Sequence, residues 1–209
     1  MHRNLCICAM IPRLKTRTRV VLMIHRLEDR KATNTGRLAT ECLVNSEVRV
    51  RGFESRPSAA FCCGADTQPV LLFPYDDAVP IAHFAGSPKP ITLVAPDGTW
   101  RQAWKVRHRV PGFRDMPCAA VEADVPSSYR LRKETHPRGL ATIEAIARAL
   151  GVLEGPAVRE RMERVFSAMV ERTLWARGEL DAKDLLHGIP EGAVRHDPES
   201  GIVRDGGPS

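Results

Sequence analysis

The sequence predicts an α/β fold with a mostly parallel sheet. Short apolar runs rich in β-branched residues recur along the chain, and amphipathic helical patterns lie between and after them. Each run is bounded by turn formers or charges, which is typical of strands buried on both faces. Alternation of the two patterns favours helices packed on a sheet. The predicted strands are residues 20–24, 70–73, 91–95 and 118–121.

Four segments have helical patterns, the first over residues 35–44 and the second over residues 100–109. In the third, Thr142 is the expected N-cap and Gly151 the first residue past the end. The fourth, residues 156–174, begins with a proline, which suits the first turn of a helix. The expected loops are residues 25–33, 51–69 and 78–90.

Length and composition indicate one domain. The chain has 209 residues, 43% hydrophobic and 27% charged, which excludes a wholly disordered chain and a coiled coil. We expect the domain to cover residues 1–187, and the polar, glycine- and proline-rich residues 188–209 to form a disordered tail. No apolar run approaches the roughly 18 residues that cross a bilayer, and the short apolar start does not resemble a signal peptide. We therefore expect a cytoplasmic protein with no membrane partner and no obligate protein partner.

Three clusters of polar residues and glycines precede or begin predicted helices. The densest, Asp97-Gly98-Thr99-Trp100, follows a predicted strand, and the ends of parallel strands are where open α/β sheets bind ligands. Taken singly, each cluster is also explained by an ordinary turn and helix cap. The other two clusters are Asn34-Thr35-Gly36-Arg37-Leu38, and Tyr129-Arg130-Leu131-Arg132 with Ala141-Thr142-Ile143-Glu144-Ala145.

Together, and in this order, the clusters resemble the motifs of the DTW-domain family, the tRNA-uridine aminocarboxypropyltransferases. The resemblance extends from about Cys6 to Leu153, and the name-giving motif is the segment from Asp97 to Trp100. Because the family is related to SPOUT-type enzymes, the resemblance implies a SPOUT-like domain with a knotted or knot-like carboxyl-terminal region. It also implies that the domain binds S-adenosylmethionine.

The implied reaction transfers the 3-amino-3-carboxypropyl group of S-adenosylmethionine to N3 of a uridine in tRNA and releases 5′-methylthioadenosine. Asp97 is the expected catalytic residue, either as the general base or as the carboxylate that orients the uracil and offsets the sulfonium charge. Arg37 or Arg132 is expected to supply a charge to the cofactor carboxylate. The residues expected to bind the cofactor are Asn34, Thr35, Arg37, Asp97, Gly98, Thr99, Trp100, Leu131, Ala141 and Thr142.

Basic residues flank this predicted site. Lys and Arg number 31 against 25 Asp and Glu, a net charge of +6 that is compatible with a polyanionic partner but does not identify it. Beside the implied site, these cations would contact tRNA phosphates around a splayed-out uridine, although a solvated face has the same composition. Trp100 or Trp104 would stack on the base, unless it belongs to the core. The expected RNA-binding residues are Arg101, Lys105, Arg107, Arg109, Arg130, Arg132 and Lys133.

Two other functions are compatible with the same residues. A SPOUT-like RNA methyltransferase would use the same cofactor and release S-adenosylhomocysteine instead. A non-catalytic RNA-binding module would need only the basic surface.

The chain departs from the family pattern at its cysteines. Family members often begin with Cys-x-x-Cys followed by Cys-x-Cys, whereas only Cys6 and Cys8 are present near this start. Two thiolates do not complete a tetrahedral zinc site, so either upstream residues are missing from the chain or the site has been lost. His2 and the adjacent Cys62 and Cys63 are candidate substitutes, although unpaired structural thiols are the favoured explanation of these cysteines. Cys6 and Cys8 are therefore the candidate zinc ligands, in a site that these two residues leave incomplete.

Overall fold

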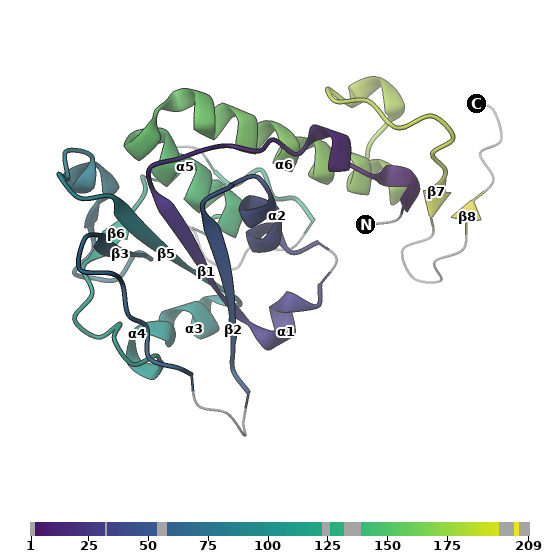
Figure 1. The fold of residues 1–209 in the computed structure, drawn as a ribbon. Coiled ribbons are helices and arrows are strands. Elements are labelled where there is room, and N and C mark those ends of the chain that lie inside the picture. The colour runs from purple at the N-terminus through teal and green to yellow at the C-terminus, as the bar shows by residue number, and fades with distance from the viewer. Residues whose placement is uncertain are drawn as a thin grey trace.

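The computed structural model describes residues 3–31, 33–53, 58–122, 126–131, 139–196 and 203–204. Its centre is a six-stranded sheet in the order β2-β1-β5-β3-β6-β4, with every neighbouring pair parallel (Figure 1). The predicted α/β class with a parallel sheet is therefore confirmed. The strands are β1 (Arg19–His25), β2 (Ser46–Arg51), β3 (Gln68–Leu72), β4 (Val79–Pro80), β5 (Ile91–Asp97) and β6 (Cys118–Ala120).

Helices cover both faces of this sheet. A separate antiparallel pair, β7 (Arg195–His196) and β8 (Val203–Arg204), lies near the carboxyl end of the chain. The α-helices are α1 (Arg26–Asp29), α2 (Thr35–Glu41), α3 (Trp100–Trp104), α4 (Val106–Arg109), α5 (Thr142–Glu154) and α6 (Pro156–Ala176). The 3₁₀-helices are η1 (Arg3–Leu5), η2 (Cys8–Met10), η3 (Ile81–Phe84) and η4 (Ala182–Asp184). Among the described helices, none has the length and apolarity that a membrane span requires.

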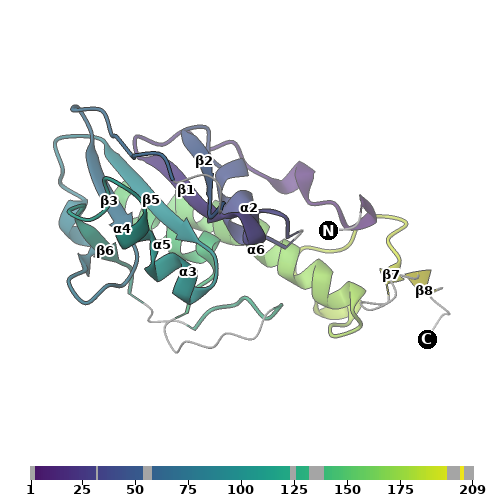
Figure 2. The same cartoon turned by 90° about the horizontal axis from the view of Figure 1, so that it is seen from below.

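Alternate strand residues define two cores. Leu22 of β1 belongs to the core that α2, α5 and α6 cover, whereas its neighbour Val21 packs in the core that contains Val106 of α4 and Phe113. This follows from the strand period of two, which sends successive side chains to opposite faces. Because both faces are covered, β1 and β5 are apolar along nearly their whole length. Figures 1 and 2 show α5 and α6 on one side of the sheet and α3 and α4 on the other.

The carboxyl-terminal half of α6 extends beyond the sheet toward the first residues of the chain (Figure 1). There Leu5 packs with Trp175 and Ala176, and Ile189 and Ala193 pack against the same cluster. The predicted domain boundary at residue 187 and the knotted region stay predictions.

Several predicted helix ends differ from the structure. Thr142 is the first residue of α5 rather than its N-cap, which is Ala141. The helix also continues through Gly151, where a Cβ would lie 3.0 Å from the Arg159 Cβ. Its last residue is Glu154, and Gly155, whose φ is +109°, is its C-cap. Gly151 therefore permits the close approach of α6, and Gly155 makes the turn that L side chains resist.

Elements also occur where only loops were expected, and one predicted helix is two. Residues 25–33 contain α1, and residues 78–90 contain β4 and η3. The predicted helix over residues 100–109 is divided at Lys105 into α3 and α4. These elements have two to five residues each, too few to establish a periodic pattern in the sequence.

Candidate functional site

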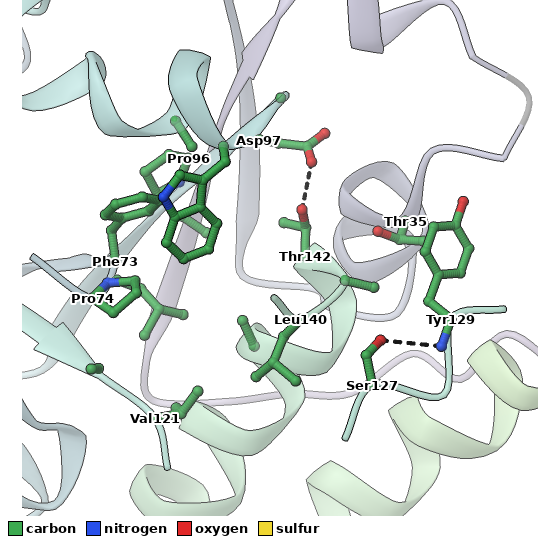
Figure 3. A pocket seen from close by; sticks show the side chains of 18 of the residues that line it. Thr35, Phe73, Pro74, Pro96, Asp97, Val121, Ser127, Tyr129, Leu140 and Thr142 are labelled. Carbon is green, nitrogen blue, oxygen red and sulfur yellow. Dashed lines mark hydrogen bonds between the residues drawn. The ribbon is translucent and has the colours of Figure 1, made fainter. Parts of the chain in front are cut away.

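A cavity of about 650 Å³ opens at the carboxyl ends of β3, β5 and β6. Its size is within the range of small-molecule sites. The lining combines strand-end residues with the start of α5 and the segment before α2, so distant parts of the sequence meet there (Figure 3). The predicted location at the carboxyl end of parallel strands therefore coincides with a cavity of the right size for a ligand.

Asp97, the last residue of β5, lines this cavity and is only 6% exposed. The Asn34 Nδ2 donates to Asp97 Oδ2 at 2.6 Å, and the Thr142 hydroxyl donates to Oδ1 at 2.5 Å (Figure 3). Asn34 is also the N-cap of α2, since its Oδ1 accepts from the Arg37 amide at 2.7 Å. Residues of three sequence clusters thus converge on one carboxylate, which they hold in a single orientation.

Gly36 permits this arrangement because α2 lies directly against Asp97. A Cβ on Gly36 would lie 2.9 Å from Asp97 Oδ2 and 2.8 Å from Leu22 Cδ1. We expect Gly36→Ala to lower the free energy of unfolding by about 1–3 kcal/mol, because the added methyl overpacks the site. Thermal unfolding measures this, with Gly64→Ala as the matched control, since a Cβ there has nothing within 4 Å. Equal melting temperatures of the two variants would contradict the prediction.

The Asp-Gly-Thr-Trp segment forms the turn from β5 into α3. Thr99 is the N-cap of α3: its Oγ1 accepts from the Gln102 amide at 3.3 Å, and its own amide donates to Gln102 Oε1 at 2.8 Å. Gly98 has a φ of +155°, and a Cβ there would lie 2.8 Å from Gln102 Oε1. The capping role that we considered for this cluster is therefore real, and it positions Trp100 in the cavity wall.

One wall of the cavity is apolar and aromatic. The ring of Phe73, which follows β3, lies 4.9 Å from that of Trp100, centroid to centroid, with a 47° tilt. Pro74, Pro80 and Val121 continue this wall. In Figure 3, Phe73 and Pro74 lie on the left, Thr35 and Tyr129 lie on the right, and Asp97 and Thr142 lie between them. A planar ring placed against the first wall would contact aromatic and proline surfaces.

The opposite wall is polar and contains residues to which we assigned no role from the sequence. Glu28 and Lys31 line the cavity, and the Lys31 ammonium donates to the Glu28 carboxylate. Glu28 as a whole is only 3% exposed. The Tyr129 hydroxyl donates to the Thr33 carbonyl at 2.9 Å and so connects this wall to the segment before α5. Glu28 and Lys31 fall in residues 25–33, where a loop was expected, so no helical pattern pointed to them.

Glu144 fastens the segment before α5 to the start of that helix. Its carboxylate, 4% exposed as a residue, accepts from the Ser127 hydroxyl at 2.5 Å, the Ser128 amide at 2.8 Å and the Ala141 amide at 2.8 Å. Glu144 is the third residue of α5, which is the position from which an acidic side chain caps the helix start. Its place in the first turn was predicted, but its bonds to Ser127 and Ser128 were not.

Some predicted cofactor residues lie outside this cavity. The Arg37 side chain points to α1, where its Nε donates to Asp29 Oδ1 at 2.7 Å. Leu131 is buried in the core that α5 and α6 cover, and its carbonyl accepts from Arg177. Arg37 and Leu131 do not line the cavity, whereas Asn34, Thr35, Asp97, Gly98, Thr99, Trp100, Ala141 and Thr142 do.

The predicted RNA-binding residues have different surroundings. Arg101 and Arg109 are exposed on α3 and α4, and the charge of Arg101, with burial and the charge of Arg109, lowers the pKa of Lys105 between them. Arg107 is instead engaged with Asp77 through two hydrogen bonds of 2.6 and 2.7 Å. Arg130 is exposed, while Arg132 and Lys133 lie outside the described residues.

The predicted metal ligands Cys6 and Cys8 are both exposed. The Cys8 amide donates to Cys6 Sγ at 3.3 Å, and hydrogen bonding from Cys8 lowers the pKa of the Cys6 thiol. Within the described part of the chain, no three His, Cys, Asp or Glu side chains are grouped so that they could hold a metal ion. His2 lies outside the described residues, and Cys62 and Cys63 are free thiols.

Curated relatives of the chain occur in animals and a plant. The chain is 27% identical over 161 residues to tRNA-uridine aminocarboxypropyltransferase 2 of Macaca fascicularis. The matched region covers 73% of this chain and 54% of that protein. For the Mus musculus protein of the same name, the identity is 27% over 176 residues, with coverage of 80% and 59%. For tRNA-uridine aminocarboxypropyltransferase A of Arabidopsis thaliana it is 26% over 199 residues, with coverage of 79% and 75%. The matched region thus spans little more than half the length of the two mammalian relatives.

A comparison with protein families gives a match over most of the chain. The DTW domain matches residues 1–174, which include the three clusters that converge on Asp97. No solved structure matches the chain significantly. From the family match, supported by the order of its motifs and their meeting at one carboxylate, we conclude that the chain belongs to the DTW-domain family.

Proposed function

We propose that the chain transfers the 3-amino-3-carboxypropyl group of S-adenosylmethionine to N3 of a uridine in tRNA. The observation that carries this proposal is the buried Asp97 carboxylate, which Asn34 and Thr142 hold in the lining of a cavity of about 650 Å³. The names of the curated relatives, tRNA-uridine aminocarboxypropyltransferases, support the same reaction.

The residues that line the cavity fit S-adenosylmethionine. Phe73, Trp100 and the neighbouring prolines offer flat apolar surfaces for an adenine ring, and Asp97 offers a negative charge for a sulfonium. The Lys31 ammonium, which also lines the cavity, offers a positive charge for an anionic group. The donor set therefore offers a surface or a charge for each chemical part of the cofactor.

When bound, S-adenosylmethionine supplies an electrophilic carbon, which forms a bond to uridine N3 as its bond to sulfur breaks, the electron pair leaving with 5′-methylthioadenosine. The N3 proton must pass to a base. Asn34 and Thr142 fix the direction of the Asp97 carboxylate through a hydrogen bond to each of its oxygens. In the proposed reaction, this carboxylate accepts the N3 proton or orients the uracil.

The products of the reaction test this proposal. Purified protein would be incubated with unmodified tRNA and S-adenosylmethionine labelled either in the methyl group or in the aminocarboxypropyl group. We expect label in tRNA only from the aminocarboxypropyl form, with 5′-methylthioadenosine as the small product in mass spectrometry. Methyl label in tRNA with S-adenosylhomocysteine would instead establish a methyltransferase. Binding of tRNA without transfer of either label would establish an RNA-binding module.

The basic surface beside the cavity suits the proposed tRNA. Trp100 and Ala103 of α3 line the cavity, and the same helix carries Arg101 toward solvent. The lowered pKa of Lys105 shows that the charges of Arg101 and Arg109 are close to it, and phosphate would relieve this repulsion. Arg107, with its two bonds to Asp77, is less available for such a contact.

Neutralising this surface should weaken the salt dependence of tRNA binding. For a variant with Arg101, Lys105 and Arg109 changed to Gln, we expect the slope of log K against log salt to fall by about 2–3, one phosphate contact for each lost cation. Filter binding between about 50 and 200 mM salt measures the slope. The control variant carries Arg161→Gln and Arg164→Gln, two exposed positions on α6 on the opposite side of the sheet. Equal slopes in both variants would exclude phosphate contact by the first group.

The remaining expectations belong to the same proposal. A SPOUT-like knot in the carboxyl-terminal region is proposed from the family resemblance, and placement in the cytoplasm is proposed from the pattern of the sequence. Among the described residues that line the cavity there is no cysteine or histidine, so the candidate zinc ligands Cys6 and Cys8 lie apart from this lining.

A further inference from the structure

Two of the described residues that line the cavity, Glu28 and Lys31, form an ion pair. It joins the Lys31 ammonium to the Glu28 carboxylate, and the two side chains differ strongly in exposure, 47% for Lys31 against 5% for Glu28. The carboxylate is therefore buried in the wall of the cavity, while the lysine side chain also reaches solvent. Because Lys31 is half exposed, this pair contributes little to folding stability.

A short series of hydrogen bonds connects the pair to Asp97 through Asn34. The Lys31 amide donates to the Glu28 carbonyl at 3.0 Å, and the Asn34 amide donates to the Lys31 carbonyl at 3.0 Å. Asn34 in turn holds Asp97 through its side chain at 2.6 Å. These contacts connect the pair, through Asn34, to the proposed catalytic carboxylate.

The lining residues restrict where a zwitterion can bind. Of the described residues that line the cavity, Lys31 is the sole basic one, and the carboxylates are Glu28, Asp97 and Glu122. An α-amino acid group carries one ammonium and one carboxylate, so it needs an anion and a cation a few ångströms apart. Glu28 and Lys31 are such a pair, whereas the wall around Phe73 offers only apolar surface.

We propose that Glu28 and Lys31 bind the α-amino-acid end of S-adenosylmethionine, with Glu28 accepting from the ammonium and Lys31 donating to the carboxylate. This inference rests on the proposed function, whose donor it positions. The assignment suits the chemistry, because the arm that is transferred must lie where RNA can reach it. Lys31, whose side chain is 47% exposed, meets that requirement, and the adenine would then occupy the aromatic wall.

Binding of four ligands to the intact chain tests the assignment without any need for turnover. Isothermal titration calorimetry would compare S-adenosylmethionine, its decarboxylated form, S-adenosylhomocysteine and 5′-methylthioadenosine. The decarboxylated form lacks only the carboxylate, and 5′-methylthioadenosine lacks the whole amino acid. The ratios between ligands therefore isolate each charge from any general effect of a substitution on the fold.

For Lys31→Met we expect a loss of affinity of about 10- to 100-fold for S-adenosylmethionine and S-adenosylhomocysteine, the value of a charge-assisted hydrogen bond. The decarboxylated ligand should bind equally well or more tightly, because Lys31 no longer competes for Glu28. Lys31→Arg, which retains the cation, should stay within about threefold of the wild type for every ligand. Equal losses for the carboxylated and decarboxylated ligands would overturn the role of Lys31.

For Glu28→Gln we expect about 10- to 100-fold weaker binding of the three ligands that carry an ammonium, with 5′-methylthioadenosine unaffected. Glu122→Gln is the matched control, since it removes an exposed carboxylate from the same lining and should preserve all four affinities. Equal weakening of 5′-methylthioadenosine would assign Glu28 a structural role and overturn the proposal for it. If Glu28→Gln does not fold, the Lys31 ratios decide alone.

Failure of this inference is distinguishable from failure of the proposed function. A wild-type chain that binds all four ligands, with variants that do not discriminate among them, refutes only the assignment of Glu28 and Lys31. A wild-type chain that binds none of them refutes the use of S-adenosylmethionine and, with it, both proposals.

Discussion

Replacing Asp97 with alanine is expected to lower the rate of aminocarboxypropyl transfer by about 100- to 10,000-fold. The estimate combines the loss of a group that takes or orients a proton with the loss of a charge that faces the sulfonium. The carboxylate is only 6% exposed, so water replaces it poorly. A single-turnover assay with tRNA and cofactor labelled in the aminocarboxypropyl group measures the rate. Equal transfer by the wild type and Asp97→Ala would remove Asp97 from the mechanism.

Asp97→Asn separates the charge of this residue from its place in the fold. The amide keeps an oxygen for the Asn34 Nδ2 and a nitrogen for the Thr142 hydroxyl, which can accept as well as donate. We therefore expect this variant to unfold close to the wild-type temperature and still lose most of the transfer rate. A stable Asn variant with wild-type transfer would show that Asp97 acts only by holding α2 and α5 in place.

Removing the Glu144 carboxylate should have the largest effect on stability. Glu144→Ala is expected to lower the free energy of unfolding by about 3–5 kcal/mol, because several hydrogen bonds to a buried carboxylate are lost together and the buried Ala141 amide loses this partner. The donors of these bonds include the Ser127 hydroxyl at 2.5 Å and the Ser128 and Ala141 amides, both at 2.8 Å. Urea denaturation measures the change.

A second acidic residue on the helices provides the control for this prediction. Glu163 pairs with Arg159 one turn away on α6, with partly exposed side chains of 36% and 42%. Such a helical pair contributes about 0.3–0.5 kcal/mol, so Glu163→Ala should change little. Similar midpoints for Glu144→Ala and Glu163→Ala would contradict the fastening role of Glu144. Faster amide exchange at Ser128 in Glu144→Ala alone would support it.

Strands in the middle of the sheet were predictable because both of their faces are buried. β1 and β5 are nearly uninterrupted apolar runs, which the sequence displays directly. β2 escaped prediction for the opposite reason: it lies at the edge, and it alternates Glu47 and Arg49 with valines along a mostly half-buried strand. An edge strand with charged residues resembles a loop in composition. Its pairing with β1 is a tertiary contact that no local pattern reports.

Motif order predicted which residues belong to the site, but their chemical partners came from the fold. Asn34, Asp97 and Thr142 were each assigned to the site from the sequence, and all three meet in the cavity. Arg37 was assigned to it as well, yet its guanidinium pairs with Asp29 of α1. An arginine beside a motif has the same sequence signature in both cases, because its long side chain can turn to either neighbour.

The sequence by itself determined the α/β class, the main buried strands and helices and the DTW-domain family, and it predicted Asp97 as a site residue. These depend on local periodicity and on ordered motifs, both of which can be read along the chain. Only the tertiary structure decided that Asn34 and Thr142, 63 and 45 residues away, hold the two oxygens of Asp97, and that Glu28 and Lys31 share its cavity. Contacts over such separations depend on how the parallel strands are ordered in the sheet, and strand order is not encoded in any single segment.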